Sequence, residues 1–165
     1  MDLLKNIIVD SPKNLPLLGI DVGKKTLGIA VSDGMQSIAV PVGTIKRTKF
    51  SKDMRLLEAH IRDYEVCGVI LGYPINMDGS EGPRCQSIRD FGLEMKNQIS
   101  DDIKGCDGLW VGLWDERLST ASVEDFVDNT VDISRQRAKD RGIIDKLAAQ
   151  VILQGALDYI QANRY

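Results

Sequence analysis

Two acidic sites stand in this sequence where the pattern of residues predicts a strand. Asp21 lies inside the apolar run 17–22, and Asp115 and Glu116 follow directly on the apolar run 109–114. A carboxylate buried in a strand must be paired, hydrated or bound to a metal, because burying it bare carries a large cost in free energy. Each site also has a plainer explanation: a turn cap for Asp21, and a surface ion pair at a strand end for the other two.

A third acidic residue, Asp145, heads the apolar stripe of the last predicted helix. Ala148, Ala149 and Ile152 follow it at i+3, i+4 and i+7, which places position 145 on the face that the helix turns toward a sheet. Its plainer explanation is an acid in the first helical turn, where the helix dipole favours negative charge. Acids on two neighbouring parallel strands and on a packed helix would together form a cluster of carboxylates.

Carboxylates held close together repel one another and raise one another's pKa. A divalent cation relieves that repulsion, and oxygen ligands without histidine or cysteine favour Mg²⁺ or Mn²⁺. Two such ions, about 4 Å apart, activate a water molecule and stabilise the leaving oxygen in phosphodiester hydrolysis. The three acidic sites therefore predict a metal-dependent enzyme that hydrolyses phosphodiester bonds.

Apolar patterning along the chain predicts the elements that position these acids. Three strands with short links indicate an antiparallel meander, and two wholly apolar runs indicate strands buried on both faces. The predicted elements are strands at about 17–22, 27–32 and 40–45, a helix at 51–64, a strand at 67–72, a helix at 84–99, a strand at 109–114, a helix from 119 or 120 to 128, and a helix at 142–161. This order predicts an α/β fold with a mixed five-stranded sheet, three antiparallel strands and then two parallel ones, flanked by helices.

Length and composition indicate one globular domain. The chain has 165 residues, of which 43% are hydrophobic and 27% charged, and its net charge is −3. These values fit a single domain at 17–165, preceded by an N-terminal lead-in at 1–16. Three scattered cysteines and one histidine make neither a disulfide framework nor a zinc site, so a reducing cytoplasm is expected. The sequence shows no signal peptide and no apolar run near the ~18 residues of a membrane span.

Four motifs, in order, are GIDVG (19–23) with GIAVSD (28–33), GYPINMDGSEGP (72–83), DERLST (115–120) and IDKLAA (144–149). In sequence and spacing they resemble the YqgF/RuvX family of Holliday junction resolvases and pre-16S ribosomal RNA nucleases. The resemblance covers about residues 17–159, and it implies an RNase H-like fold for that part of the chain.

The resemblance implies an active site built from the acids of the first, third and fourth motifs. It assigns catalytic and metal-binding roles to Asp21, to Asp115 or Glu116, and to Asp145, with Mg²⁺ or Mn²⁺ as the cofactor. Side chains alternate along a strand, so only one of the two neighbouring acids is expected to face the site. The match leaves open which one. All the acids of the family's motifs are present, which argues against an inactive member.

Basic and polar residues near these motifs are candidates for contacts with nucleic-acid phosphates. They are Lys24, Lys25, Asn76, Arg84, Arg117, Arg135, Arg137 and Arg141. Lysine offers a point charge and arginine a fork of donors. The same residues also fit solvated surface charges or plain turn chemistry, and the basic stretch 135–141 fits either a solvated loop or a segment that orders on nucleic acid.

The leading hypothesis is a metal-dependent endonuclease that acts on structured RNA or branched DNA. The substrate would be the 5′ end of pre-16S rRNA, in a ribosome precursor, or a Holliday junction, and no motif reads bases or a 2′-hydroxyl to decide between them. The alternative is a non-catalytic nucleic-acid-binding or ribosome-associated module, for which carboxylates at a phosphate site serve no purpose. No membrane partner is expected. The oligomeric state stays open between monomer and homodimer, since a junction resolvase needs two-fold symmetry.

Overall fold

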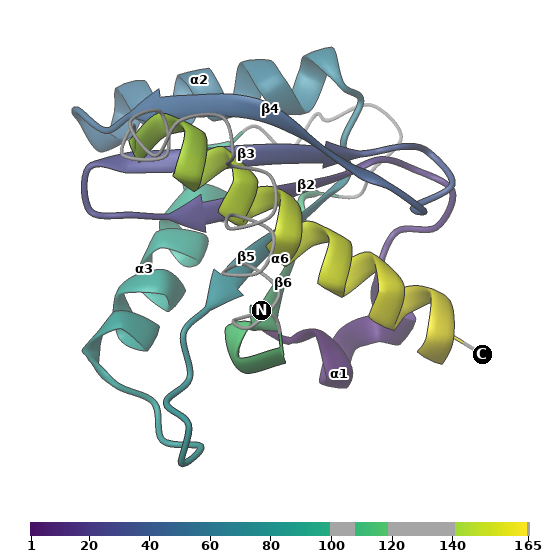
Figure 1. Ribbon diagram of the computed structural model, residues 1–165. Helices are drawn as coiled ribbons and strands as arrows, with labels where there is room; N and C mark the ends of the chain where they lie inside the picture. Colours follow the sequence, from purple (N-terminus) through teal and green to yellow (C-terminus); the bar gives the residue numbers. More distant parts are fainter. Residues whose placement is uncertain (100–107, 119–140, 165) are drawn as a thin grey trace, which may run out of the picture.

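A computed structural model describes residues 1–99, 108–118 and 141–164, and for 141–145 only the backbone. These residues form a six-stranded sheet in the order β1-β6-β5-β2-β3-β4, with helices on both faces (Figure 1). In chain order the elements are β1 (Asp2–Leu3), α1 (Leu4–Ile7), η1 (Ile8–Asp10), β2 (Leu17–Val22), β3 (Thr26–Ser32), β4 (Ala39–Lys46), α2 (Phe50–Asp63), β5 (Gly68–Tyr73), α3 (Pro83–Gln98), β6 (Trp110–Asp115), η2 (Glu116–Leu118) and α6 (Arg141–Asn163).

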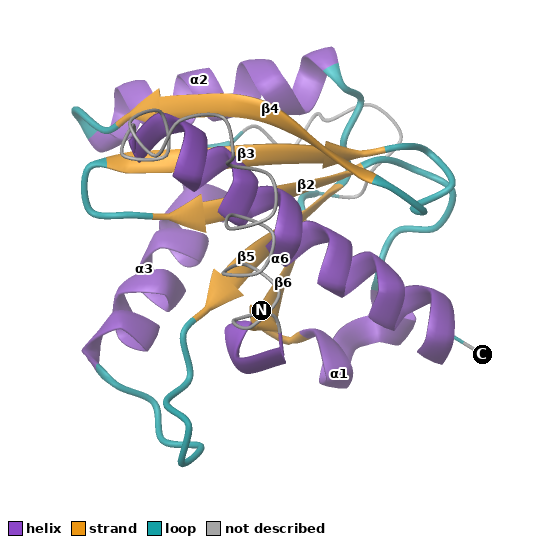
Figure 2. Cartoon of the chain, viewed as in Figure 1, coloured by secondary structure: helices purple, strands orange, loops and turns teal. Residues whose placement is uncertain are grey.

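The sheet confirms the predicted topology of three antiparallel strands followed by two parallel ones. β2, β3 and β4 form the meander, β5 runs parallel to β2, and β6 runs parallel to β5 (Figure 2). The β2–β3 link, Gly23 to Lys25, is a tight turn that closes with a 2.9 Å hydrogen bond from Gly23 N to Thr26 O. Such a short link holds both strands in one register and keeps the residues at the end of β2 in a defined position.

A sixth strand, β1, lies parallel to β6 at the edge of the sheet. The sequence did not predict it, because Asp2 and Leu3 are too few residues to show an alternating pattern. β1 exists because β6 presents an open edge to which a passing segment can pair. The residues that follow β1 also join the core, since Leu4 and Ile8 are buried.

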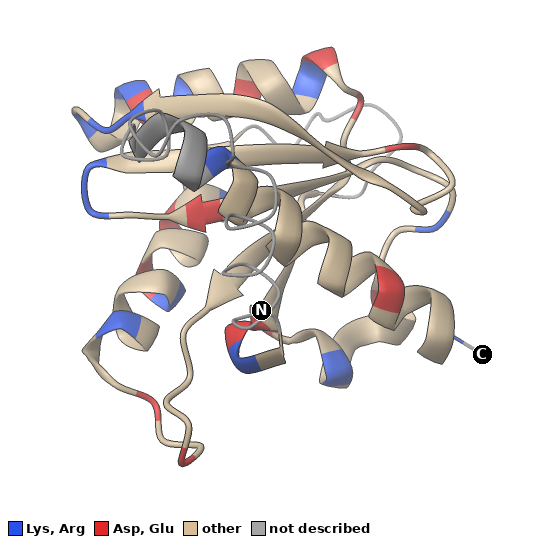
Figure 3. Cartoon of the chain, in the orientation of Figure 1, with Lys and Arg blue, Asp and Glu red and all other residues tan. Residues whose placement is uncertain are grey.

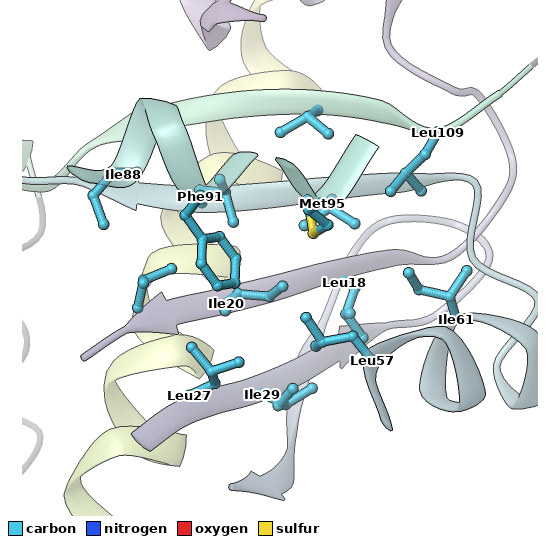
Figure 4. Close-up of a cluster of buried hydrophobic side chains, with 14 of the residues drawn as sticks. Leu18, Ile20, Leu27, Ile29, Leu57, Ile61, Ile88, Phe91, Met95 and Leu109 are labelled. Carbon is cyan, nitrogen blue, oxygen red and sulfur yellow. The ribbon is translucent and has the colours of Figure 1, made fainter. Parts of the chain in front are cut away.

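One face of the sheet carries α2 and α3 and the larger hydrophobic cluster (Figure 4). Alternate residues of β2, Leu18, Ile20 and Val22, point into this cluster. Since successive side chains of a strand point to opposite faces, the residues between them, including Asp21, belong to the other face. The alternation of β2 therefore separates its carboxylate from the larger core.

The other face is covered by α6, which contacts β2, β3, β4 and β5. Its buried stripe includes Ala149, Ile152 and Leu153, as the spacing of apolar residues in the sequence predicted. A Cβ on Gly19 would lie 2.7 Å from the Cβ of Leu153, so only glycine lets the helix approach β2 this closely. Gln154 fixes the helix across the sheet by accepting a 2.9 Å hydrogen bond from Ala39 N.

Several sequence predictions lie outside the described residues, namely the helix from 119 or 120 to 128 and the basic stretch up to 140. Cys85, in the first turn of α3, is a free, buried thiol. Within the described ranges, no helix combines the length and the apolar character that crossing a membrane requires.

Candidate active site

Asp21 lies one residue before the end of β2, on the face covered by α6. It pairs in register with Gly28 of β3 and is half-buried. On the same face of the strand, Gly19 lies directly under Ala149 and Leu153 of α6. Asp21 is therefore the first polar side chain beyond the apolar contact between β2 and the helix.

Glu116 reaches the same face from the end of β6, where it begins the short helix η2. Its carboxylate lies over Gly72 of β5: a Cβ at that position would overlap Oε1 of Glu116 and lie 2.6 Å from Cδ1 of Ile152. The absence of a side chain at Gly72 leaves the space that this carboxylate occupies. Glycine at the end of β5 is thus part of the site, as a cradle for Glu116.

The electrostatic environment of Glu116 links it to Asp21. Burial first, and then the negative charge of Asp21, raise the pKa of Glu116 from 4.5 to about 7, against the opposing guanidinium of Arg84. Two carboxylates from β2 and β6 therefore share one partly buried site, in which ionising both is unfavourable without a nearby positive charge.

Asp115 faces away from this site although it precedes Glu116 directly. Along β6, Val111 and Leu113 point into the cluster on the α2–α3 face, and Asp115 continues that alternation. Arg117 binds it through Nη2 to Oδ2 at 2.7 Å and through Nε to both carboxylate oxygens at 3.1 Å. The structure thus brings Glu116, and not Asp115, beside Asp21.

Asp145 belongs to α6, in the part of the helix (141–145) for which the structure describes only the backbone. Its position is one helical turn before Ala149, whose carbonyl oxygen would be 3.1 Å from a Cβ on Gly19. The beginning of α6 lies toward the same end of the sheet as the β2–β3 turn (Figure 1). Among the side chains that the structure describes, no group of three acidic, histidine or cysteine residues comes together.

The donor set of Asp21 and Glu116 fits a hard divalent cation. Both offer carboxylate oxygens, which Mg²⁺ and Mn²⁺ prefer over nitrogen or sulfur ligands. The raised pKa of Glu116 reflects its burial first and the negative charge of Asp21 second, and a bound cation would oppose both effects. The cradle at Gly72 leaves the carboxylate space beside Ile152 that a larger residue would fill.

The predicted phosphate contacts occupy different positions. Lys24 and Lys25 are exposed at the tip of the β2–β3 turn. Arg84, in the first turn of α3, donates a 3.1 Å hydrogen bond from Nη2 to Val22 O and acts on the charge of Glu116. Asn76 donates to Ser80 Oγ at 3.0 Å within the β5–α3 loop.

The remaining basic candidates are not brought to the acids by the described residues. Arg117 is held by Asp115. Arg135 and Arg137 lie outside the described residues, and Arg141 is described as the first residue of α6 in its backbone alone.

Arg47, between β4 and α2, is a basic residue that the sequence did not single out. Its Nη1 donates a 2.7 Å hydrogen bond to Gly23 O, directly beside the lysines of the β2–β3 turn. Figure 3 shows basic residues along that turn and in the β4–α2 link, and an acidic position at the end of β2. No sequence motif contains Arg47, because its proximity to the site depends on the pairing of β3 with β4.

Comparison with known proteins gives a consistent family. A family model described as "RuvX: Holliday junction resolvase" matches residues 16–159. A Rhodospirillum centenum protein named "Putative pre-16S rRNA nuclease" is 45% identical over 150 residues, 91% of this chain and 77% of that protein. A Ruegeria protein of the same name is 43% identical over 163 residues, 99% of this chain and 97% of that protein.

Solved structures give the fold. T. thermophilus RuvC, in complex with a Holliday junction substrate, superimposes with a TM-score of 0.57 at 11% identity, covering 90% of this chain and 97% of that one. The yeast mitochondrial Holliday junction resolvase Ydc2 superimposes with a TM-score of 0.50 at 12% identity, covering 98% and 87%. At these identities the likeness shows a shared RNase H-like fold and nothing finer.

Proposed function

Because the chain belongs to the RuvX family of Holliday junction resolvases, we propose that it is a metal-dependent endonuclease that hydrolyses phosphodiester bonds in structured nucleic acid. The observation that carries this proposal is the meeting of Asp21 and Glu116 on one face of the sheet, where the charge of Asp21 disfavours the ionised form of Glu116. Carboxylates that a fold brings together at such a cost are typical of catalytic sites.

Asp21 and Glu116, joined by Asp145 from α6, would hold the divalent cation, Mg²⁺ or Mn²⁺. When bound, such ions supply an activated water molecule and stabilise charge on the leaving oxygen, and a pair of ions does both. Gly72 keeps Glu116 in place by leaving room for its carboxylate. In this assignment Asp115 is not a ligand, since Arg117 already holds both of its oxygens.

Arg84 would bind the substrate phosphate beside the acids. Its guanidinium is anchored on Val22 O and lowers the pKa of Glu116, so it lies within electrostatic reach of the site. A guanidinium can donate two parallel hydrogen bonds to phosphate oxygens. Lys24 and Lys25, at the turn next to β2, would add point charges that hold the strand through its backbone.

The 5′ end of pre-16S rRNA, within a ribosome precursor, is the substrate that we propose first, because the 41–45% identical relatives carry that name. A Holliday junction is the second candidate, because the family model is described as a junction resolvase. The second substrate requires a homodimer to cut two strands symmetrically, whereas the first allows a monomer. Both substrates place the protein in the cytoplasm.

The test is cleavage of both substrates in parallel. Purified protein is incubated with Mg²⁺ or Mn²⁺ and either a labelled four-way DNA junction or an RNA precursor stem with single-stranded flanks. We expect cleavage of one substrate, abolished in Asp21→Asn. Asp158→Asn, an exposed carboxylate on α6 that bonds only to Gln154 in the described contacts, is the matched control and retains activity.

Cleavage of neither substrate, with salt-sensitive binding retained, would contradict the catalytic proposal. The result would favour the non-catalytic nucleic-acid-binding or ribosome-associated module. Equal cleavage by wild type and Asp21→Asn would point instead to a contaminating nuclease.

A further inference from the structure

A cavity of about 480 Å³ lies at the end of β2. It opens on the α2–α3 face of the sheet, whereas Asp21 and Glu116 lie on the α6 face. Val22, which points into the α2–α3 face, lines it, together with the β2–β3 turn, the β4–α2 link and the first turns of α3. Arg84 lines the cavity and also acts on the charge of Glu116. The cavity and the acid pair are therefore two neighbouring sites that share one arginine.

Two guanidinium groups in the cavity are held in place from opposite sides of the chain. Arg84 of α3 donates to Val22 O at 3.1 Å, and Arg47 donates to Gly23 O at 2.7 Å. Arg47 also lies over the ring of Phe91, with its Cζ 5.5 Å from the ring centre. Each arginine uses one of its five N–H groups for this hydrogen bond to a backbone carbonyl. The remaining N–H groups can donate to a ligand.

In the described residues, no carboxylate within ion-pair distance balances the positive charge of the cavity. No acidic residue lines it, and in the described part of the chain neither Arg47 nor Arg84 forms an ion pair with a carboxylate. Lys24 adds a third cation at the rim. Two anchored guanidinium groups and a lysine without a carboxylate partner favour an anionic ligand.

The size and floor of the cavity indicate more than a single phosphate. Its volume lies within the range of roughly 300–1,000 Å³ that is usual for organic ligands. Val22, Ile88 and Phe91 form an apolar floor, and Thr48 and Ser87 also line the cavity. The hydroxyl of Thr48 donates to Asp53 Oδ1 at 3.3 Å and that of Ser87 to Pro83 O at 3.2 Å, so each can still accept a hydrogen bond. This lining fits a nucleotide: the arginines would bind its phosphate, the apolar floor would hold its base, and the hydroxyls would meet the polar edge of that base.

We propose that this cavity binds one unstacked nucleotide of the substrate strand, adjacent to the phosphodiester bond at the acid pair. The inference rests on the proposed nuclease function and defines its substrate more closely. In a duplex the bases stay stacked and turn toward the helix axis, so only the backbone could reach this recess. The strand must therefore be unpaired at this position, as in a single-stranded flank or an opened junction.

Binding without cleavage tests the inference. Fluorescence anisotropy in EDTA compares a labelled single-stranded 12-nucleotide RNA with a fully paired duplex of the same strand. For Arg47→Ala we expect affinity for the single strand to fall about tenfold, the effect of losing a charged hydrogen bond, and affinity for the duplex to fall less than about twofold. Arg47→Lys keeps the charge but not the fork and should fall between.

Arg55→Ala, an exposed arginine of α2 away from the cavity, is the matched control. Circular dichroism and thermal melting of each variant establish that it is folded. A second readout places 2-aminopurine at each position of the RNA in turn: one position should change its emission on wild type and not on Arg47→Ala, because only an unstacked base fluoresces strongly.

The outcomes separate this inference from the proposed function. Equal losses on single strand and duplex would make Arg47 a general phosphate contact, and no loss on either would mean that the cavity stays empty; both overturn the inference. Selective loss in a protein that cleaves neither substrate would retain the nucleotide site and reject the nuclease. Cleavage that Asp21→Asn abolishes but Arg47→Ala leaves unchanged, with unchanged binding, would do the reverse.

Discussion

Asp115 and Glu116 are neighbours in sequence and opposites in environment. Asp115 continues the side of β6 that faces α2 and α3, where Arg117 binds both of its oxygens. Glu116 turns to the α6 face, lies over Gly72 and meets Asp21. Arg117 pairs with the first carboxylate, whereas burial and the charge of Asp21 raise the pKa of the second.

This difference shows how the fold separates Asp115, an acid paired within the protein, from Glu116, which we propose to bind a metal. Period-two alternation assigns the two side chains to opposite faces, and Glu116 lies on the face where the charge of Asp21 acts on it. A compensated charge stabilises the chain at no functional cost. The ionised form of Glu116 lowers the stability of the folded protein, because burial and the charge of Asp21 disfavour it. We infer that a bound cation offsets that cost.

The largest effect should appear in cleavage. Glu116→Gln is expected to lower the rate of phosphodiester hydrolysis by roughly 10³-fold, about 4 kcal/mol of transition-state stabilisation, because it removes a carboxylate from the proposed metal site. Asp115→Asn should lower the rate less than about tenfold. Single-turnover assays with saturating Mg²⁺ measure both. The reverse ranking would assign the ligand to Asp115.

The next effect is on stability and depends on pH. Burial raises the pKa of Glu116 to about 7 in the folded, metal-free protein, against 4.5 normally, so its contribution to stability is lost as pH rises through 7. Glu116→Gln should therefore be more stable than wild type at pH 8, by up to about 3 kcal/mol, and equally stable below pH 4.5. Urea unfolding in EDTA measures the difference, and Asp115→Asn should show no such pH-dependent gain.

A smaller effect is expected from the cation itself. At pH 8, Mg²⁺ at ten times its dissociation constant should stabilise wild type by about 1.4 kcal/mol, which thermal melting detects as a higher midpoint. Glu116→Gln and Asp21→Asn should show a reduced shift. Asp115→Asn should respond like wild type. A shift that is equal in all four proteins would mean that the cation binds elsewhere.

The smallest effect should come from the ion pair between Arg117 and Asp115, measured as a change in the free energy of unfolding. Arg117→Ala releases Asp115 into a solvated environment, where an ion pair contributes little. We expect the free energy of unfolding to change less than it does in Glu116→Gln, and the change to shrink further at high salt. Denaturant titrations at low and high NaCl measure it. A large, salt-independent loss would make this pair a structural anchor of η2.

Much of this architecture could be predicted from the sequence. Apolar alternation located the meander within one or two residues, and helical spacing located α2, α3 and α6. The unusual position of Asp21 within a strand pointed to one half of the proposed site. Along β6, Val111 and Leu113 face one side of the sheet and Trp114 faces the other. Extending this alternation by two residues from Trp114 would have placed Glu116 on the α6 face.

The features that follow from the sequence alone are of short range: strand and helix periods, the tight turn between β2 and β3, and the opposite directions of Asp115 and Glu116. Only the tertiary structure decided the rest. β1 forms because β6 offers an open edge, Gly72 becomes a cradle because β5 and β6 lie in register, and Arg47 joins the site because β4 pairs with β3. Such contacts join residues distant in the chain, and a local pattern cannot encode which distant partner a side chain meets.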